Sequence, residues 1–133
     1  MATRSRIGIK DKLGNIKSVY CHWDGYPSNN GKLLLENYNT TKKVKTLIAL
    51  GDISFLRETI DCPEGHSFDT PKDNCTIFYH RDRGEDWEHV KPILGLASGE
   101  EYDYVFDVKE NKWTYQAYGR GFKDLTPEVC KEA

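Results

Sequence analysis

The sequence has no long hydrophobic run. No stretch approaches the roughly 18 consecutive apolar residues of a membrane-spanning helix, and the first residues lack the apolar segment of a secretory signal peptide. We therefore expect a protein that has no membrane partner and stays in the cytoplasm. Four cysteines are present, and in a reducing compartment we expect thiols rather than disulfides.

An excess of charge of one sign is also missing. Nineteen Lys and Arg residues stand against 21 Asp and Glu residues, and the formal net charge is −2. Proteins bind duplex nucleic acid largely through positive charge, so this balance argues against such a partner. A local cluster of arginines could still hold one small anion.

The 133 residues fit one domain, 1–133. Residues 6–10 with 16–23, and 102–108 with 113–118, have the composition and turn residues of two β-hairpins. Helical segments lie between them. This order predicts an α+β fold, with an antiparallel or mixed β-sheet built from N- and C-terminal hairpins and one face covered by short helices.

Two central segments predict the helices. Residues 32–38 and 42–50 are rich in Leu and Lys, with Thr40 or Thr41 as an N-cap and Gly51 as the stop. Their apolar side chains form a stripe that could cover the sheet.

The remaining segments give weaker signals. Residues 52–56 predict a short turn of helix, 76–80 a strand, and Pro127 the first position of a last helical turn. Residues 61–74 contain two prolines and a glycine, which predicts an irregular connection. The structure of 87–100 stays open between short helix and extended chain.

Aromatic and basic residues gather in two short segments. The first ends the N-terminal hairpin, and strand ends that run into loops commonly carry binding residues. Its candidates are His22, Trp23, Asp24 and Tyr26. The alternative is ordinary packing of aromatic residues beside a Gly-Tyr-Pro turn.

The second segment runs from Tyr79 to Asp86. The forked guanidinium groups of Arg81 and Arg83 suit a phosphate. Alternating charges are also typical of a solvated surface, and the neighbouring Asp82 and Glu85 weaken an anion site.

Two arrangements of thiols and imidazoles are less favoured. Cys62, His66, Cys75 and His80 offer the ligands that zinc prefers, but their spacing matches no standard zinc finger. We therefore predict neither a metal nor a cofactor. Cys21 is adjacent to His22, and neighbouring strand residues point to opposite faces, so the two cannot form a nucleophile–base pair unless the strand ends there.

Four strings in the sequence carry a resemblance. RSRIG at 4–8, SVYCHWDGYP at 18–27, LIALGDIS at 47–54 and YHRDRGE at 79–85 are similar to segments of small accessory proteins of tailed phages and prophages. The likeness spans roughly the first two thirds of the chain, which implies a shared fold. It also implies an accessory protein in the host bacterial cytoplasm, a class whose members can blunt host defences. It implies no catalytic residue.

The leading hypothesis is a binding protein without catalytic activity that sequesters a nucleotide-like ligand. Trp23 or Tyr26 would stack on a base while arginines take the phosphates. The predicted ligand-binding residues are Arg4, Arg6, His22, Trp23, Asp24, Tyr26, Tyr79, Arg81 and Arg83.

Two alternatives stay open. One is an inhibitor that binds a host defence protein through exposed aromatic residues. The other is a small hydrolase or nuclease with His22 or His80 as base and Asp24 and Glu85 as nearby carboxylates. An exposed hairpin edge would also allow a homodimer.

Overall fold

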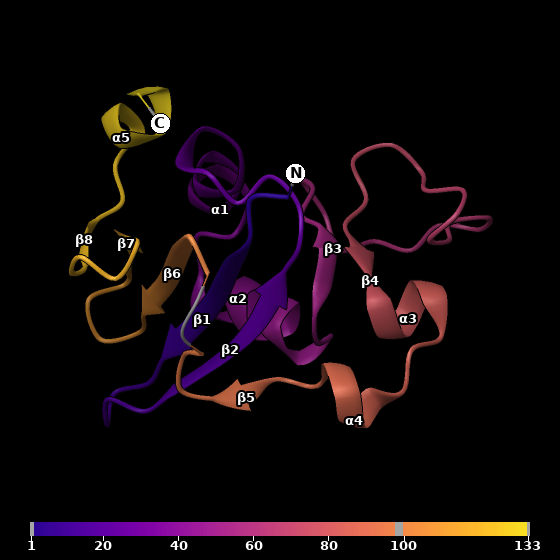
Figure 1. Ribbon diagram of the computed structural model, residues 1–133, viewed down its shortest axis with the longest axis horizontal. Helices are drawn as coiled ribbons and strands as arrows, with labels where there is room; N and C mark the ends of the chain where they lie inside the picture. Colours follow the sequence, from indigo (N-terminus) through magenta and orange to yellow (C-terminus); the bar gives the residue numbers. More distant parts are fainter. Residues whose placement is uncertain (1, 98–99, 133) are drawn as a thin grey trace.

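The computed structural model describes residues 2–97 and 100–132, and one mixed sheet of eight strands organises them. The strand order is β4-β3-β2-β1-β6-β7-β8, and β5 pairs with β2 on the same edge as β3. The strands are β1 (Ser5–Lys10), β2 (Ile16–Cys21), β3 (Ile53–Phe55), β4 (Ile77–Phe78), β5 (Ile93–Leu94), β6 (Tyr102–Asp107), β7 (Lys112–Ala117) and β8 (Lys123–Asp124). Strand β1 is antiparallel to β2 and parallel to β6, while β6 and β7 form the second hairpin (Figure 1). The predicted α+β class and both hairpins are confirmed.

Short helices cover one face of this sheet. The helical elements are a π-helical turn η1 (Pro27–Gly31), α1 (Lys32–Asn37), α2 (Thr41–Ala49), α3 (Tyr79–Arg83), α4 (Trp87–Val90) and α5 (Pro127–Glu132). Helix α2 lies behind β1 and β2 in Figure 1, and α5 packs on η1 and α1. The predicted N-cap is confirmed, since the Thr40 hydroxyl accepts a hydrogen bond from the Lys43 N–H at 3.2 Å. None of the helices in the described residues is long and apolar enough to cross a membrane.

Side-chain alternation divides the sheet into an apolar and a polar face. Ile7, Val19 and Tyr104 point to the side of α1 and α2, where Leu34 and Leu47 complete the buried core. The intervening residues point the other way. We call that side the polar face and define it by Arg6, Ser18, Tyr20, His22 and Asp103.

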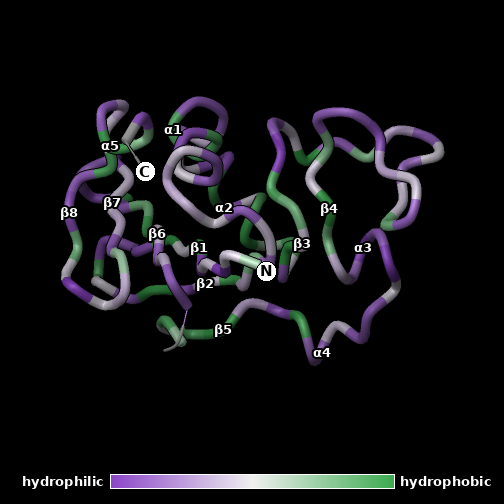
Figure 2. Tube along the Cα trace, turned by 45° about the horizontal axis from the view of Figure 1, so that its top comes forward, coloured by the Kyte–Doolittle hydropathy of each residue, from purple (hydrophilic) through white to green (hydrophobic). Residues whose placement is uncertain are grey.

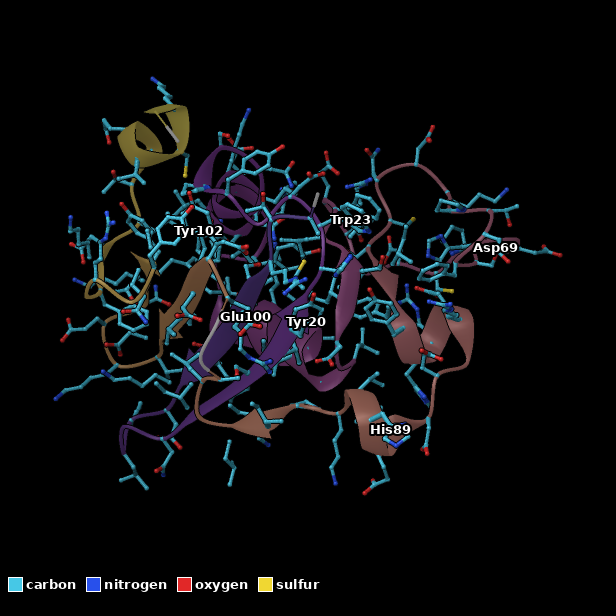
Figure 3. The ribbon with its side chains drawn as sticks, viewed as in Figure 1. Tyr20, Trp23, Asp69, His89, Glu100 and Tyr102 are labelled. Carbon is cyan, nitrogen blue, oxygen red and sulfur yellow. The ribbon has the colours of Figure 1, made fainter. Side chains whose placement is uncertain are left out.

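The chain passes once over the polar face. Strand β5 lies beside β2 and β6 lies beside β1, so β2 and β1 lie between the two ends of the β5–β6 connection. The Gly95 carbonyl of this connection accepts a hydrogen bond from the Ser18 hydroxyl at 2.6 Å. Glu100, from the same connection, lies over the middle of the sheet (Figure 3). Arg6, Ser18 and Asp103 on this face are buried, although none of the helices in the described residues covers them.

Three local predictions differ from the structure. Residues 52–56 were expected to form a helical turn, but 53–55 form β3, because Ile53 pairs with both Cys21 and Phe78. The strand expected at 76–80 ends at Phe78, where the Asp82 carboxylate accepts the Phe78 N–H at 2.8 Å and starts α3. The described part of the segment left open at 87–100 contains both alternatives, α4 and then β5, and residues 98–99 lie outside the described residues. Residues 61–74 contain neither helix nor strand, as predicted.

Gly51 should be the least replaceable glycine of the fold. Its φ is +86°, and a Cβ would lie 2.7 Å from the Val90 carbonyl oxygen. Gly84 has a similar φ of +81° with nothing within 4 Å, so it is the matched control. We expect Gly84→Ala to lower the free energy of unfolding by about 1 kcal/mol through backbone strain. Gly51→Ala should cost about 2 kcal/mol more, because the segment at Val90 must move. Equal losses in urea unfolding would contradict this packing.

Candidate functional site

The four segments that resemble phage proteins each contribute a residue to the polar face. Arg6 comes from β1, Tyr20 from β2, Asp52 precedes β3, and Tyr79 follows β4. The Asp52 carboxylate accepts the Tyr20 N–H at 2.9 Å, and the Asp52 carbonyl accepts the Tyr79 N–H at 3.2 Å. Sheet pairing thus places side chains from four separate segments around one centre, which Tyr20 marks in Figure 3.

Arg6 is the buried cation at this centre. Its side chain donates from Nε to the Ser18 hydroxyl at 3.1 Å and from one terminal nitrogen to the Ser18 carbonyl at 3.2 Å. The residue is only 7% exposed, and it forms no ion pair with the described residues. Burial lowers the pKa of Arg6, and the more distant carboxylates of Asp52, Glu100 and Asp103 oppose that shift. Arg6 is therefore a buried cation whose charge is balanced by three carboxylates at longer range rather than by a contacting anion.

A hollow of about 510 Å³ opens at Asp103, the β6 register partner of Arg6, and Arg6 itself is not among its lining residues. The hollow is lined by Leu96, Ala97, Glu100, Asp103, Gln116, Tyr118 and Gly119. One oxygen of Asp103 accepts the Gln116 side-chain N–H at 2.9 Å. The other oxygen of Asp103 and one of Glu100 are buried without a hydrogen-bond partner among the described residues. Burial raises the pKa of both carboxyl groups, although Arg6 acts in the opposite direction. Such acceptors favour a ligand that brings hydrogen-bond donors.

Asp103→Asn should stabilise the protein in the absence of ligand. The raised pKa means that the folded state disfavours the charged carboxylate, so at pH 7 the neutral amide should increase the free energy of unfolding by about 1 kcal/mol. Because the pKa of Asp103 is raised in the folded state, this carboxyl group stabilises the fold below its unfolded pKa. That contribution is lost as the pH rises through the folded-state pKa. The advantage of the variant should therefore vanish below about pH 4. Urea unfolding at several pH values checks this, with exposed Asp69→Asn as control. A destabilised Asp103→Asn protein at pH 7 would contradict the expectation.

An aromatic row continues from Tyr20 along the end of β2. The Tyr20 hydroxyl and the His22 Nδ1 are 2.6 Å apart, and the His22 ring meets the edge of Trp23. Trp23 stacks on Phe55 with ring centroids 5.6 Å apart, and the Arg57 guanidinium lies over Phe55. One face of Trp23 is therefore already occupied within the protein.

Asp24 and Tyr26 belong to the turn that follows β2. Asp24 has a positive φ of 54°, and the Tyr26 carbonyl accepts the N–H groups that start η1. The turn is fastened to the core by the Tyr104 hydroxyl, which donates to the Gly25 carbonyl at 2.6 Å. Both residues thus shape the end of the sheet, and no hydrogen bond of either side chain to the described polar-face residues is present.

Arg81 and Arg83 lie apart from Arg4 and Arg6. Arg81 donates to the carbonyls of Ile60 and Thr76 and to the Asp82 carboxylate, while Arg83 stacks over Phe68. Strand β4, which precedes Arg81, is three strand positions from β1, a separation of about 14 Å. The predicted residues therefore separate into two groups. Arg4, Arg6, His22 and Tyr79 gather around the polar face, whereas Arg81 and Arg83 fasten the 61–74 connection.

The four zinc candidates do not form one site, because Cys62 and His66 lie against the Asp82 carboxylate while Cys75 and His80 bond to backbone carbonyls. His66 accepts the Lys72 N–H at Nδ1 and faces the Asp82 carboxylate with Nε2 at 3.3 Å. His80 bonds to the Glu85 carbonyl, and the Cys75 thiol lies against the Asp73 carbonyl. Within residues 2–97 and 100–132, no three His, Cys, Asp or Glu side chains are arranged to hold a metal ion.

Sequence reasoning missed several residues of the site, among them Tyr20, Asp52, Glu100, Asp103 and Tyr118. Tyr20 was inside a motif but was not selected, and Asp103 is a charged residue in a strand that alternates with Tyr102 and Tyr104. That alternation places Asp103 opposite the core and could have identified it. Asp52 and Glu100 reach the site only through tertiary structure, which no local signal reveals.

Comparisons of the chain with protein-family models, curated proteins and solved structures find no match. The likeness to phage proteins therefore stays a sequence-based prediction. What the fold and the site define is an α+β protein with a polar sheet face, a buried arginine and an adjoining hollow.

Proposed function

We propose that this protein is a non-catalytic binding protein that sequesters a nucleotide-like ligand on the polar face. The observation that supports it most is that a cation without an ion-pair partner and acceptors without hydrogen-bond donors lie close together. Arg6 is a buried cation that forms no ion pair with the described residues, and the hollow at its register partner Asp103 has buried carboxylate oxygens without donors. A nucleotide supplies an anion and hydrogen-bond donors. Its phosphate can form an ion pair with Arg6, and its hydroxyl or amino groups can donate to Glu100 and Asp103.

Tyr118 is the best-placed platform for a base. It borders the hollow and is 60% exposed, and because Arg120 lies over one face of its ring, a base would stack on the opposite face. Stacking on an exposed aromatic ring is favourable for every base. In this arrangement Tyr118 takes the role that the sequence suggested for Trp23 or Tyr26, and exposed Arg4 adds positive charge near Tyr20.

Binding is favoured over catalysis by the state of the reactive groups. The Cys21 thiol is fully buried on the core side, and burial raises its pKa to about 11, so it is a poor nucleophile at neutral pH. The ring bonds recorded for His22 and His80 go to Tyr20 and to a backbone carbonyl rather than to a carboxylate. The hydrolase alternative is therefore not supported by a pairing of His22 or His80 with a carboxylate among the described residues.

The resemblance extends the proposal to a biological setting. A phage-type accessory protein that removes a nucleotide signal would act as a counter-defence protein in the host bacterial cytoplasm. This setting rests on the sequence likeness, whereas the ligand class rests on Arg6 and the hollow.

A nucleotide panel tests the ligand class. Nucleoside monophosphates, triphosphates, cyclic nucleotides and dinucleotides would be titrated into ¹⁵N-labelled protein. At least one class should shift the amide signals of Arg6, Tyr20 and Asp103 in a saturable way, and Asp103→Asn should weaken that binding by about tenfold or more. Arg83→Gln, outside the polar face, should bind normally. A panel without saturable shifts at these amides would contradict the proposal.

A further inference from the structure

A second surface lies at the turn of the N-terminal hairpin, away from the hollow at Asp103. A groove of about 1390 Å³ is formed there by the hairpin turn, the side of α2 that carries Lys45, Ile48 and Ala49, Trp87 and the residues around β5. The exposed segment around β5 is coloured as hydrophobic in Figure 2. Leu13 is 87% exposed and Leu94 is 84% exposed, which is unusual for large apolar side chains that line the same depression.

The rim of this groove is positively charged. Lys12, Lys17 and Lys45 line it, all three are exposed, and none forms an ion pair with the described residues. The only acidic residue among the lining residues is Asp11, whose carboxylate accepts the N–H groups of Leu13 and Asn15 at 2.9 Å and holds the turn. A local excess of positive charge thus surrounds apolar side chains, although the whole chain has a net charge of −2.

We propose that this groove binds an acidic amphipathic segment of another protein. Apolar side chains of that segment would cover Leu13, Leu94 and the ring of Trp87, and its carboxylates would meet the three lysines. An apolar centre with a charged rim is the usual anatomy of a protein-binding surface, and the positive rim selects an acidic partner over a basic one. The proposal is independent of the ligand site, because the groove and the hollow share no lining residue.

Two synthetic peptides test the charge requirement. Both are short amphipathic helices with the same leucine positions, and the polar positions are all glutamate in one and all lysine in the other. The glutamate peptide should shift the amide signals of Leu13, Trp87 and Leu94 in ¹⁵N-labelled protein, with an affinity that falls as salt rises. The lysine peptide should not bind.

Variants of exposed residues test the location without disturbing the fold. The double variant Leu13→Ser and Leu94→Ser should weaken the glutamate peptide by about tenfold or more, because apolar contact area is lost. Lys45→Glu should also weaken it, whereas Lys43→Glu, on the same helix but outside the groove, should change the affinity by less than about twofold.

Three results would overturn the proposal. The first is equal binding of both peptides, and the second is the absence of saturable binding at the groove. The third is self-association of the unmodified protein that the double serine variant abolishes, since the occupant would then be a second copy of this chain.

Discussion

Replacing Asp82 with alanine is expected to lower the free energy of unfolding by about 3 kcal/mol, because it leaves a buried polar network without its acceptor. The Asp82 side chain is almost fully buried, and His66 faces its carboxylate. The carboxylate accepts hydrogen bonds from the Phe78 N–H at 2.8 Å and from the Arg81 Nε at 2.9 Å. These contacts join β4, α3 and the irregular 61–74 connection. Exposed Asp69, at the outer end of that connection in Figure 3, is the matched control, and Asp69→Ala should change stability by less than about 0.5 kcal/mol.

The pH dependence gives this prediction a second test. Burial alone would raise the pKa of Asp82, but hydrogen bonds from Arg81 and the Phe78 N–H outweigh it and lower the pKa below its usual value. A lowered pKa stabilises the folded state above the unfolded value, and that contribution is lost as the pH falls through the folded value. The difference between unmodified protein and Asp82→Ala should therefore shrink below about pH 4. A difference that stays constant down to about pH 2 would contradict a charged Asp82 as its source.

Replacing Arg6 with glutamine is expected to weaken the nucleotide-like ligand by about 100-fold, because truncating one partner of a buried charge pair typically costs 2–5 kcal/mol. Glutamine can still donate to the Ser18 carbonyl, so the sheet should fold normally, which circular dichroism can check. Arg6→Lys keeps the charge but loses the fork, and an intermediate affinity is expected. Binding by calorimetry separates these outcomes. Unchanged affinity in Arg6→Gln would remove Arg6 from the site.

Local signals in the sequence account for the larger elements of the fold. The hairpins followed from period-2 alternation and turn residues, and α2 followed from Thr40 and Gly51, which act within a few residues of the helix ends. Strand β3 was missed because its stability comes from pairing with Cys21 and Phe78, far along the chain. Short strands of this kind have little intrinsic preference, so their partners decide them.

Local signals also predicted part of the candidate site. Alternation in β1 and β2 correctly separated Ser18, Tyr20 and His22 from the Val19 face. It could not show that Glu100 crosses over the sheet, because that depends on the path between β5 and β6. Alternation also could not show that Arg81 donates its hydrogen bonds to Asp82, Ile60 and Thr76, since forked guanidinium groups suit internal acceptors as well as ligands.

Native mass spectrometry of protein purified from a bacterial cytosol tests the central claim most directly. The unmodified protein and Arg83→Gln should each retain a nucleotide-sized mass that disappears on denaturation, and Arg6→Gln from the same cytosol should lack it. A bare polypeptide in all three preparations, or a mass retained equally by Arg6→Gln, would contradict a ligand held on the polar face.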